Sequence, residues 1–211
     1  MKQLKTLIIL LFVASVTTAQ DRSDVFKADT KITWLGLDFS KAKLIGDREK
    51  LGSESDIRYL LESWNKLIVN EEEKFDIALA IEKKKIEKNI QPTLDHNATL
   101  EVLSMLSNAE KDYLHLNRDG VAEIIASYDF KGLSGIGLMF NIESFSKLNE
   151  EASIWVTFIN IDTKEVLFSE RVTAEPRGFG MRNFWGGALF VAIERIKKKE
   201  YEMWRKKYYR P

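Results

Sequence analysis

Three consecutive β-strand patterns in the C-terminal half constrain the fold of this chain more than any other feature. Apolar residues recur at every second position from Ile136 to Ile142, which is the period of a half-buried strand. Residues 152–161 and 166–174 have the composition of two further strands, and the polar residues 162–165 between them are compatible with a hairpin turn. We therefore predict three consecutive antiparallel strands over residues 135–174.

Helical patterns lie on both sides of these strands. The dense apolar run from Phe184 to Ile196 predicts a helix over residues 183–205 that packs on the strands. Upstream, apolar residues at helical spacing between 57 and 68 follow a capping start at 53–56, which predicts a second amphipathic helix.

The remaining segments complete the expected order of elements. Residues 32–39 are almost continuously apolar and favour a strand buried on both faces. Residues 75–81 alternate and favour a strand, with a helix as the alternative, and residues 117–128 favour a short helix. Residues 88–116 show no clear pattern. The order β-α-β-α-β-β-β-α predicts an α+β fold: a two-layer sandwich with a mostly antiparallel sheet and helices on one face.

The N-terminus has the organisation of a secretory signal peptide. Two lysines precede an apolar run, and small residues end at Ala19; the run is too short to span a bilayer. We expect residues 1–19 to be removed, leaving Gln20 first in a periplasmic or secreted protein. A buried N-terminal helix is the alternative. Residues 20–30 are polar and predict a flexible arm, and residues 31–211 predict one α+β domain.

The composition narrows the classes of function. The chain has no cysteine, which excludes disulfides, thiolate metal sites and lipid attachment at a cysteine. Its 32 basic and 32 acidic residues balance, which argues against general nucleic-acid binding. No segment after the first 19 residues approaches membrane-spanning length. We identify no catalytic residues, no cofactor motif and no metal-ligand spacing. His96 and His115, the two histidines, favour ordinary structural roles over metal binding.

The most unusual stretch is the glycine-rich segment 178–187, which leads into the last helix. Glycines before a helix can cradle an anion with backbone N–H groups. The alternative is that they permit a sharp turn and close packing. Asp38, at the end of the first strand beside Ser40 and Lys41, is either a pocket residue or a turn cap. The candidate ligand-binding residues are Arg177, Gly178, Gly180, Arg182, Asn183 and Asp38.

The C-terminal segment combines cations with aromatic residues. Such a mixture suits an anionic lipid surface or a partner groove, and a solvated helix end is the alternative. The candidate surface-binding residues are Lys197, Lys198, Lys199, Arg205, Lys206, Lys207 and Arg210.

Two stretches resemble known families. The hairpin Asp162-Thr-Lys-Glu-Val166 resembles that of periplasmic proteins related to the curli secretion channel subunit and to the activator lipoproteins of penicillin-binding proteins, in which the turn often reads Asp-x-Thr-Gly. The order of elements is also similar to theirs. The signal-like N-terminus and the segment 178–186 resemble small exported Bacteroidetes proteins of unknown function. These resemblances imply an assembly or accessory role in the cell envelope and bring no catalytic residues.

From the sequence we expect a non-enzymatic binding or accessory protein of the bacterial cell envelope, with an envelope protein or surface as its partner. A hydrolase of an envelope polymer and a binding module for an anionic small ligand are the alternatives.

Overall fold

The structure, a computed structural model, describes residues 20–46, 49 and 52–210. The predicted signal peptide, residues 1–19, lies outside the described residues. The strands are β1 (Ile32–Asp38), β2 (Lys43–Ile45), β3 (Glu87–Lys88), β4 (Leu106–Ser107), β5 (Ile136–Ser146), β6 (Glu151–Asn160) and β7 (Glu165–Ala174). The α-helices are α2 (Glu54–Asn70), α3 (Ile77–Ala80), α4 (Gln91–Ala98), α5 (Arg118–Ser127), α6 (Met181–Arg195) and α7 (Tyr201–Tyr208).

Strands β5, β6 and β7 form the predicted antiparallel unit. β5 pairs with β6 and β6 with β7 over nearly their full lengths. The turn between β6 and β7 is held by the Asn160 side chain, whose Oδ1 accepts from the N–H groups of Asp162 and Thr163 at 3.0 and 3.2 Å. Lys164 has a φ of 60° in this turn, a conformation that costs a non-glycine residue roughly 1–2 kcal/mol. The prediction of three consecutive strands is confirmed.

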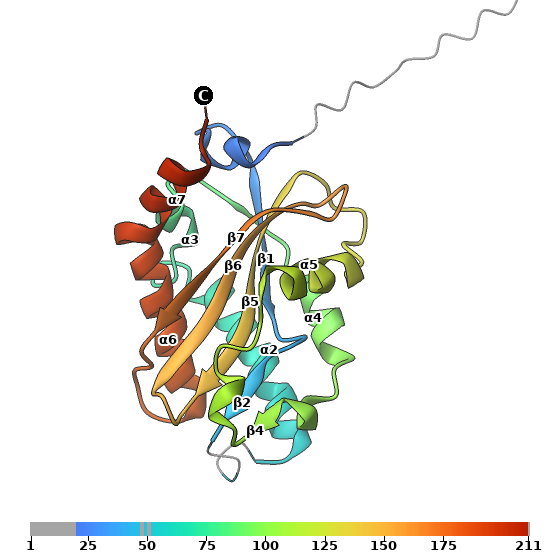
Figure 1. The fold of residues 1–211 in the computed structure, drawn as a ribbon, viewed down its shortest axis with the longest axis vertical. Coiled ribbons are helices and arrows are strands. Elements are labelled where there is room, and N and C mark those ends of the chain that lie inside the picture. The colour runs from blue at the N-terminus through green and yellow to red at the C-terminus, as the bar shows by residue number, and fades with distance from the viewer. Residues whose placement is uncertain (1–19, 47–48, 50–51, 211) are drawn as a thin grey trace, which may run out of the picture.

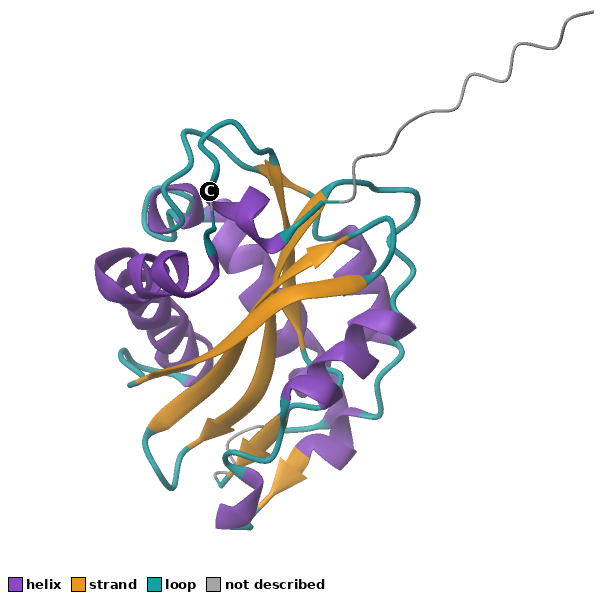
Figure 2. Ribbon diagram, turned by 45° about the horizontal axis from the view of Figure 1, so that its top comes forward, coloured by secondary structure: helices purple, strands orange, loops and turns teal. Residues whose placement is uncertain are grey.

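Strands β1 and β2 lie end to end along the other side of β5. β1 pairs in parallel with the first half of β5, and β2 pairs in parallel with its last three residues. The short strands β3 and β4 extend the sheet outward by parallel pairing with β1 and β2. Figure 2 shows the resulting curled sheet with helices around it.

The predicted fold class is wrong in two respects. Among the strand pairs of the described residues, four are parallel and two antiparallel, so the sheet is not mostly antiparallel. Helices also cover both faces: α2 and α6 pack on one and α5 on the other (Figure 1). The molecule is therefore an α/β fold and not a two-layer α+β sandwich. The connection from β2 to β5 runs through α2, α4 and α5, and such a crossover returns the chain parallel to its starting strand.

Helix α2 forms where the apolar spacing predicts it. A capping box starts it, in which Ser53 Oγ accepts from Asp56 N–H at 3.3 Å and Asp56 Oδ2 accepts from Ser53 N–H at 2.8 Å. The helix also completes the outer edge of β1, because Asn65 Oδ1 accepts from Leu37 N–H at 2.7 Å. From α4, Asn97 Oδ1 accepts from Phe39 N–H at 3.1 Å. Along this edge of β1, the two side-chain amides take the place of a neighbouring strand as hydrogen-bond partners.

The predicted strand over residues 75–81 is wrong. Asp76 Oδ1 accepts from Leu79 N–H at 2.9 Å, which caps the short helix α3 and stops the backbone from extending. The prediction over residues 117–128 is confirmed, since Asn117 caps α5 through a 2.8 Å bond from Gly120 N–H. The final helix runs from α6 through a π-helical turn, Ile196–Glu200, into α7.

The hydrophobic core is divided by the sheet into two parts. The larger part lies between the sheet and helices α2, α3, α6 and α7, and includes Trp34, Trp64 and Phe140. The smaller part lies between the opposite face and α5, and includes Met139 and Trp155. On this second face, polar contacts add to the small apolar cluster in holding the covering segments to the sheet.

The segment expected to be a flexible arm, residues 20–30, contains a 3₁₀ turn at Arg22–Phe26. Val25 of this turn is fully buried, and its carbonyl oxygen accepts from Tyr201 Oη at 3.2 Å. Because Val25 and Phe26 pack on the main core, this segment is part of the domain. None of the helices in the described part of the chain combines the length and apolar character needed to cross a membrane.

Candidate ligand-binding pocket

A cavity of about 410 Å³ opens where β2 and β5 end and α6 begins. Both strands point their carboxyl ends at it, because they are parallel. In α/β sheets ligands commonly bind outside the carboxyl ends of the strands. Its walls are mostly apolar and are formed by the side chains of Leu44, Ile45, Phe145, Met181, Phe184 and Trp185.

The floor of the cavity is built from packed aromatic rings. Phe145 and Trp185 stack with their centroids 4.7 Å apart and their planes 5° apart. Trp64 meets Phe145 edge-on at 5.2 Å, and its Nε1 donates to Arg182 O at 2.9 Å. Trp64 and Trp185 are both buried. These contacts support the side of the cavity that Phe145 and Trp185 form.

Lys147 is the charged residue among the described side chains that line the cavity. Its backbone N–H donates to Ile45 O at 2.8 Å, which continues the pairing of β2 with β5 by one residue. Its Nζ lies 4.1 Å from the centroid of the Phe184 ring and 3.4 Å from Glu150 Oε1. The ammonium group is therefore held against an aromatic wall of the cavity.

Phe179 stands at the rim and is 95% exposed. It lies between Gly178 and Gly180, whose φ values of 112° and 77° are those that glycine adopts most readily. Gly180 is also the N-cap residue of α6 and provides no side-chain hydrogen bond there. The first backbone N–H groups of α6 consequently have no side-chain cap from the N-cap residue.

Two other glycines of the segment serve packing. A Cβ on Gly187 would come within 2.0 Å of Arg177 O, and a Cβ on Gly186 within 2.7 Å of Leu67 Cδ2 on α2. Both contacts are shorter than side chains tolerate. The glycines thus let α6 approach α2 and the chain that precedes it, as the packing alternative predicts.

The structure brings only part of the predicted ligand-binding set to the cavity. Gly178 and Gly180 line it. Arg182 points to α2, where its Nε donates to Ser63 Oγ at 2.6 Å, and its Nη1 donates to Asn183 Oδ1 at 3.2 Å. Arg177 is exposed and lines a separate hollow along α6 with Phe190 and Val191.

Asp38 lies elsewhere, fully buried at the break between β1 and β2. Its carboxylate accepts from Tyr128 Oη at 2.8 Å, Asn141 Nδ2 at 3.0 Å and Ser40 N–H at 3.2 Å. Burial, and next the charge of Asp38, raise the pKa of Tyr128 well above its usual value. The carboxylate closes the break between the two strands, which agrees with the turn-cap alternative.

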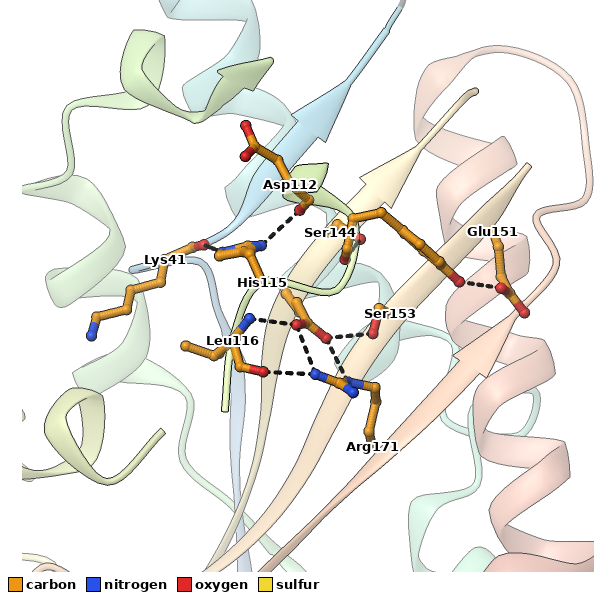
Figure 3. A network of polar contacts seen from close by, with 10 residues as sticks. Lys41, Asp112, His115, Leu116, Ser144, Glu151, Ser153 and Arg171 are labelled. Atoms are coloured by element: carbon orange, nitrogen blue, oxygen red, sulfur yellow. Dashed lines mark hydrogen bonds and ion pairs between the residues drawn. The ribbon is translucent and has the colours of Figure 1, made fainter. Parts of the chain in front are cut away.

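A second buried carboxylate, Glu143, organises the polar side of the sheet (Figure 3). Its oxygens accept from Arg171 Nε and Nη2 at 2.8 and 3.0 Å, from Leu116 N–H at 2.6 Å and from Ser153 Oγ at 2.6 Å. Arg171 also donates to Leu116 O at 2.6 Å and stacks on Trp155 at 4.7 Å. This network fastens the segment that leads into α5 to the sheet.

The two histidines take structural positions. His96 stacks on Tyr128 at 4.3 Å. His115 contacts the carbonyl oxygens of Asp112 and Lys41 through its two ring nitrogens, at 2.7 and 2.9 Å. Across residues 20–46, 49 and 52–210, no three His, Asp or Glu side chains are grouped as a metal ion requires.

The predicted surface-binding cations of the C-terminal helix largely meet carboxylates of the same chain. Lys197 and Lys198 pair with Glu194, Arg205 and Lys206 with Glu202, and Lys207 with Glu170. Arg205 pairs with Glu82 as well. In the described part of the chain, no ion pair involves Lys199 or Arg210. The binding of an anionic surface by this helix stays a prediction.

Glu170 joins this helix to β7. It accepts from Lys207 Nζ at 2.6 Å, from Arg118 Nη2 at 3.0 Å and from Tyr208 Oη. Burial acts to raise the pKa of Glu170, but the hydrogen bonds and charges of these partners outweigh it and hold the pKa below its usual range. Tyr201 and Trp204 are buried on the same helix, so the helix is part of the core and not an appendage.

Comparisons with known proteins give no relative from which a function could be transferred. No protein-family model matches the chain, and no curated protein is similar enough to count as a match. The resemblances to envelope proteins therefore stay predictions.

Sequence reasoning missed Lys147 and the apolar walls of the cavity. Leu44, Ile45 and Phe145 have the pattern of ordinary core residues, and nothing local shows that a space lies beside them. Lys147 directly follows β5, at the carboxyl end of a strand, where ligand-binding groups are commonly placed, but the alternation in the sequence ended at Ile142 and did not mark this position.

Proposed function

We propose that this chain is a non-enzymatic binding protein of the cell envelope and that the cavity at the start of α6 holds the apolar part of a small ligand. The envelope location is supported by the signal-like N-terminus. N-terminal sequencing of the protein from its native host is expected to begin near Gln20, and an intact Met1 would contradict export.

The observation that carries the binding proposal is the cavity itself. Its volume of about 410 Å³ falls within the range of roughly 300–1,000 Å³ typical of small-molecule sites. Its walls are aliphatic and aromatic and are supported by the stacked pair of Phe145 and Trp185. An apolar group that fills it is removed from water, which is favourable at about 25 cal/mol per Å² of buried apolar surface.

The chemistry of the lining favours binding over catalysis. A hydrolase needs an acid, a base or a nucleophile at the substrate, and Lys147 is the ionisable side chain among the described lining residues. The buried carboxylates of Asp38 and Glu143 lie outside the lining and accept hydrogen bonds from neighbouring side chains.

The test uses the neutral fluorescent probe 1-aminoanthracene, whose emission changes when it enters an apolar cavity, and its displacement by 1-dodecanol. The variant Met181→Trp fills the cavity from the first turn of α6. The matched control, Met203→Trp, carries the same change on α7 at a site that is 48% exposed and outside the lining.

We expect saturable binding to the parent protein and to Met203→Trp, and at least tenfold weaker binding to Met181→Trp, with all three proteins melting at similar temperatures. Absence of saturable binding to the parent, or equal binding by Met181→Trp, would contradict the proposal.

A further inference from the structure

We infer that the ligand of this cavity is an anionic amphiphile, whose apolar part fills the apolar space and whose head group is bound by Lys147. This inference rests on the proposed function and adds the chemical class of the ligand.

The position of the Lys147 ammonium group is the first argument. The residue is fixed at its backbone by the 2.8 Å bond to Ile45 O, and its Nζ lies 4.1 Å from the Phe184 ring centroid. The side chain is 32% exposed, so the charge is partly shielded from water yet still accessible. A cation at the edge of an apolar cavity is complementary to a molecule with an apolar body and one anionic end.

The weakness of the existing ion pair is the second argument. Glu150 is 73% exposed and lies 3.4 Å from Lys147, and exposed pairs of this kind contribute about 0–1 kcal/mol. A ligand carboxylate, sulfate or phosphate can therefore replace Glu150 at Lys147 with little loss. The contact between the ligand and Lys147 would be less exposed to solvent than the ion pair between Glu150 and Lys147 that it displaces.

The arrangement of the nearby acidic residues is the third argument. Glu150, Glu151 and Glu175 line a separate polar hollow, and Phe184 lines both this hollow and the apolar cavity. Of these three carboxylates, Glu150 alone pairs with Lys147, and none of the three lines the apolar cavity. The charge that lines the apolar space itself is positive, since Lys147 is the ionisable group among its described lining residues.

The experiment compares three twelve-carbon ligands that differ in head group: dodecanoate, 1-dodecanol and dodecyltrimethylammonium. Each is tested for displacement of 1-aminoanthracene from the full mature protein, below the micelle-forming concentration for the two ionic ligands and below the solubility limit for 1-dodecanol. The variant is Lys147→Gln, which keeps a polar side chain of similar length. The matched control is Lys206→Gln, a side chain that is 75% exposed on α7 and remote from the cavity lining.

We expect dodecanoate to bind the parent protein at least about tenfold more tightly than 1-dodecanol, as a hydrogen bond to a charged group predicts, and dodecyltrimethylammonium to bind most weakly. Lys147→Gln should remove the preference for dodecanoate while leaving the affinity for 1-dodecanol unchanged, and Lys206→Gln should change neither. Shortening the carboxylate should weaken binding about fourfold for each methylene removed.

The outcomes separate this inference from the proposed function. If 1-dodecanol binds as tightly as dodecanoate, or if the preference survives Lys147→Gln, the anionic ligand class is wrong and the apolar cavity still binds. If the probe does not bind, both proposals are wrong; if the probe binds and none of the three ligands displaces it, the ligand class is wrong and the proposed function stands.

Discussion

The contact between Arg171 and Glu143 gives the sharpest test of how the second face of the sheet is stabilised. The Glu143 side chain is fully buried, and that of Arg171 is 31% exposed. Arg171→Met would leave the Glu143 carboxylate with donors from Leu116 and Ser153 only. Removing one partner of a buried pair typically costs about 3–5 kcal/mol because the other charge stays buried. Since Arg171 is partly exposed, we expect the lower end of this range.

A loss of about 3 kcal/mol corresponds to a fall in melting temperature of roughly 6–12 °C for a chain of this size. The assay is urea denaturation at pH 7, followed by circular dichroism, for Arg171→Met, Glu143→Gln and the double variant. The double variant should be more stable than the sum of the two single losses predicts, because a neutral amide tolerates the missing cation. The control is Arg118→Met, whose side chain is 57% exposed, with an expected loss of about 1 kcal/mol or less.

The reasoning is refuted if Arg171→Met costs less than about 1 kcal/mol. It is also refuted if the two single losses add to within about 0.5 kcal/mol, as they do for independent sites. Either result would show that the network is solvated or that it rearranges when the arginine is removed.

Three further predictions concern other parts of the molecule. Gly187→Ala should destabilise the protein more than Gly132→Ala, measured by thermal melting, because the added Cβ would lie 2.0 Å from a carbonyl oxygen in the first case, whereas in the second it meets open space and costs only the roughly 1–2 kcal/mol of a side chain at a φ of 76°. Equal losses would contradict the packing role. The pKa of Glu170 is lowered in the folded state, so its stabilising contribution is complete above about pH 5 and is lost as the pH falls below the usual glutamate value of about 4.3. The difference in stability between the parent and Glu170→Gln should therefore shrink between pH 6 and pH 3, and a constant difference would contradict this. The mature protein should co-sediment with acidic vesicles at low salt, and the double variant Lys199→Gln/Arg210→Gln should co-sediment less. Binding that does not weaken with added salt would exclude an electrostatic attraction by the C-terminal helix.

The sequence was sufficient for the elements whose contacts are local. The hairpin of β6 and β7 needs a short polar turn and two strand patterns, and α2 needs a capping box and apolar residues at helical spacing. Both were predicted. The direction in which β1 pairs with β5 depends on residues about a hundred positions apart, and no local pattern in β1 encodes it. That is why the sheet was expected to be mostly antiparallel.

The polar face of β5 explains the second error in the fold. The half-buried pattern of this strand assigned its alternate positions, which include Asn141 and Glu143, to a polar face, so helices were expected on the other face alone. Both side chains are in fact fully buried, because Asp38, Thr157 and Arg171 provide their hydrogen-bond partners. A polar residue indicates exposure only when no buried partner is available for it, and partners on distant strands cannot be recognised from one sequence.

Of the candidate site, only the glycine-rich turn could be predicted from the sequence, and not the side chains around it. The glycines of segment 178–187 marked the turn before α6, and two of them line the cavity. The arginines beside them were assigned to the site by their proximity in sequence, but Arg182 turns toward Ser63 on α2. Lys147 reaches the cavity from β5, and this requires the tertiary fold.

The unequal division of the core by the sheet has a consequence for local opening. The larger part joins five or more elements through interlocked aromatic side chains, whereas α5 and the segment before it are held by a small apolar cluster and by the Glu143 network. Regions with fewer apolar contacts open at lower free energy than the global unfolding transition. Amide protons of α5 should accordingly exchange with solvent before those of β5 and β6, in a sub-global event that leaves the strands, the cavity and the C-terminal helix intact.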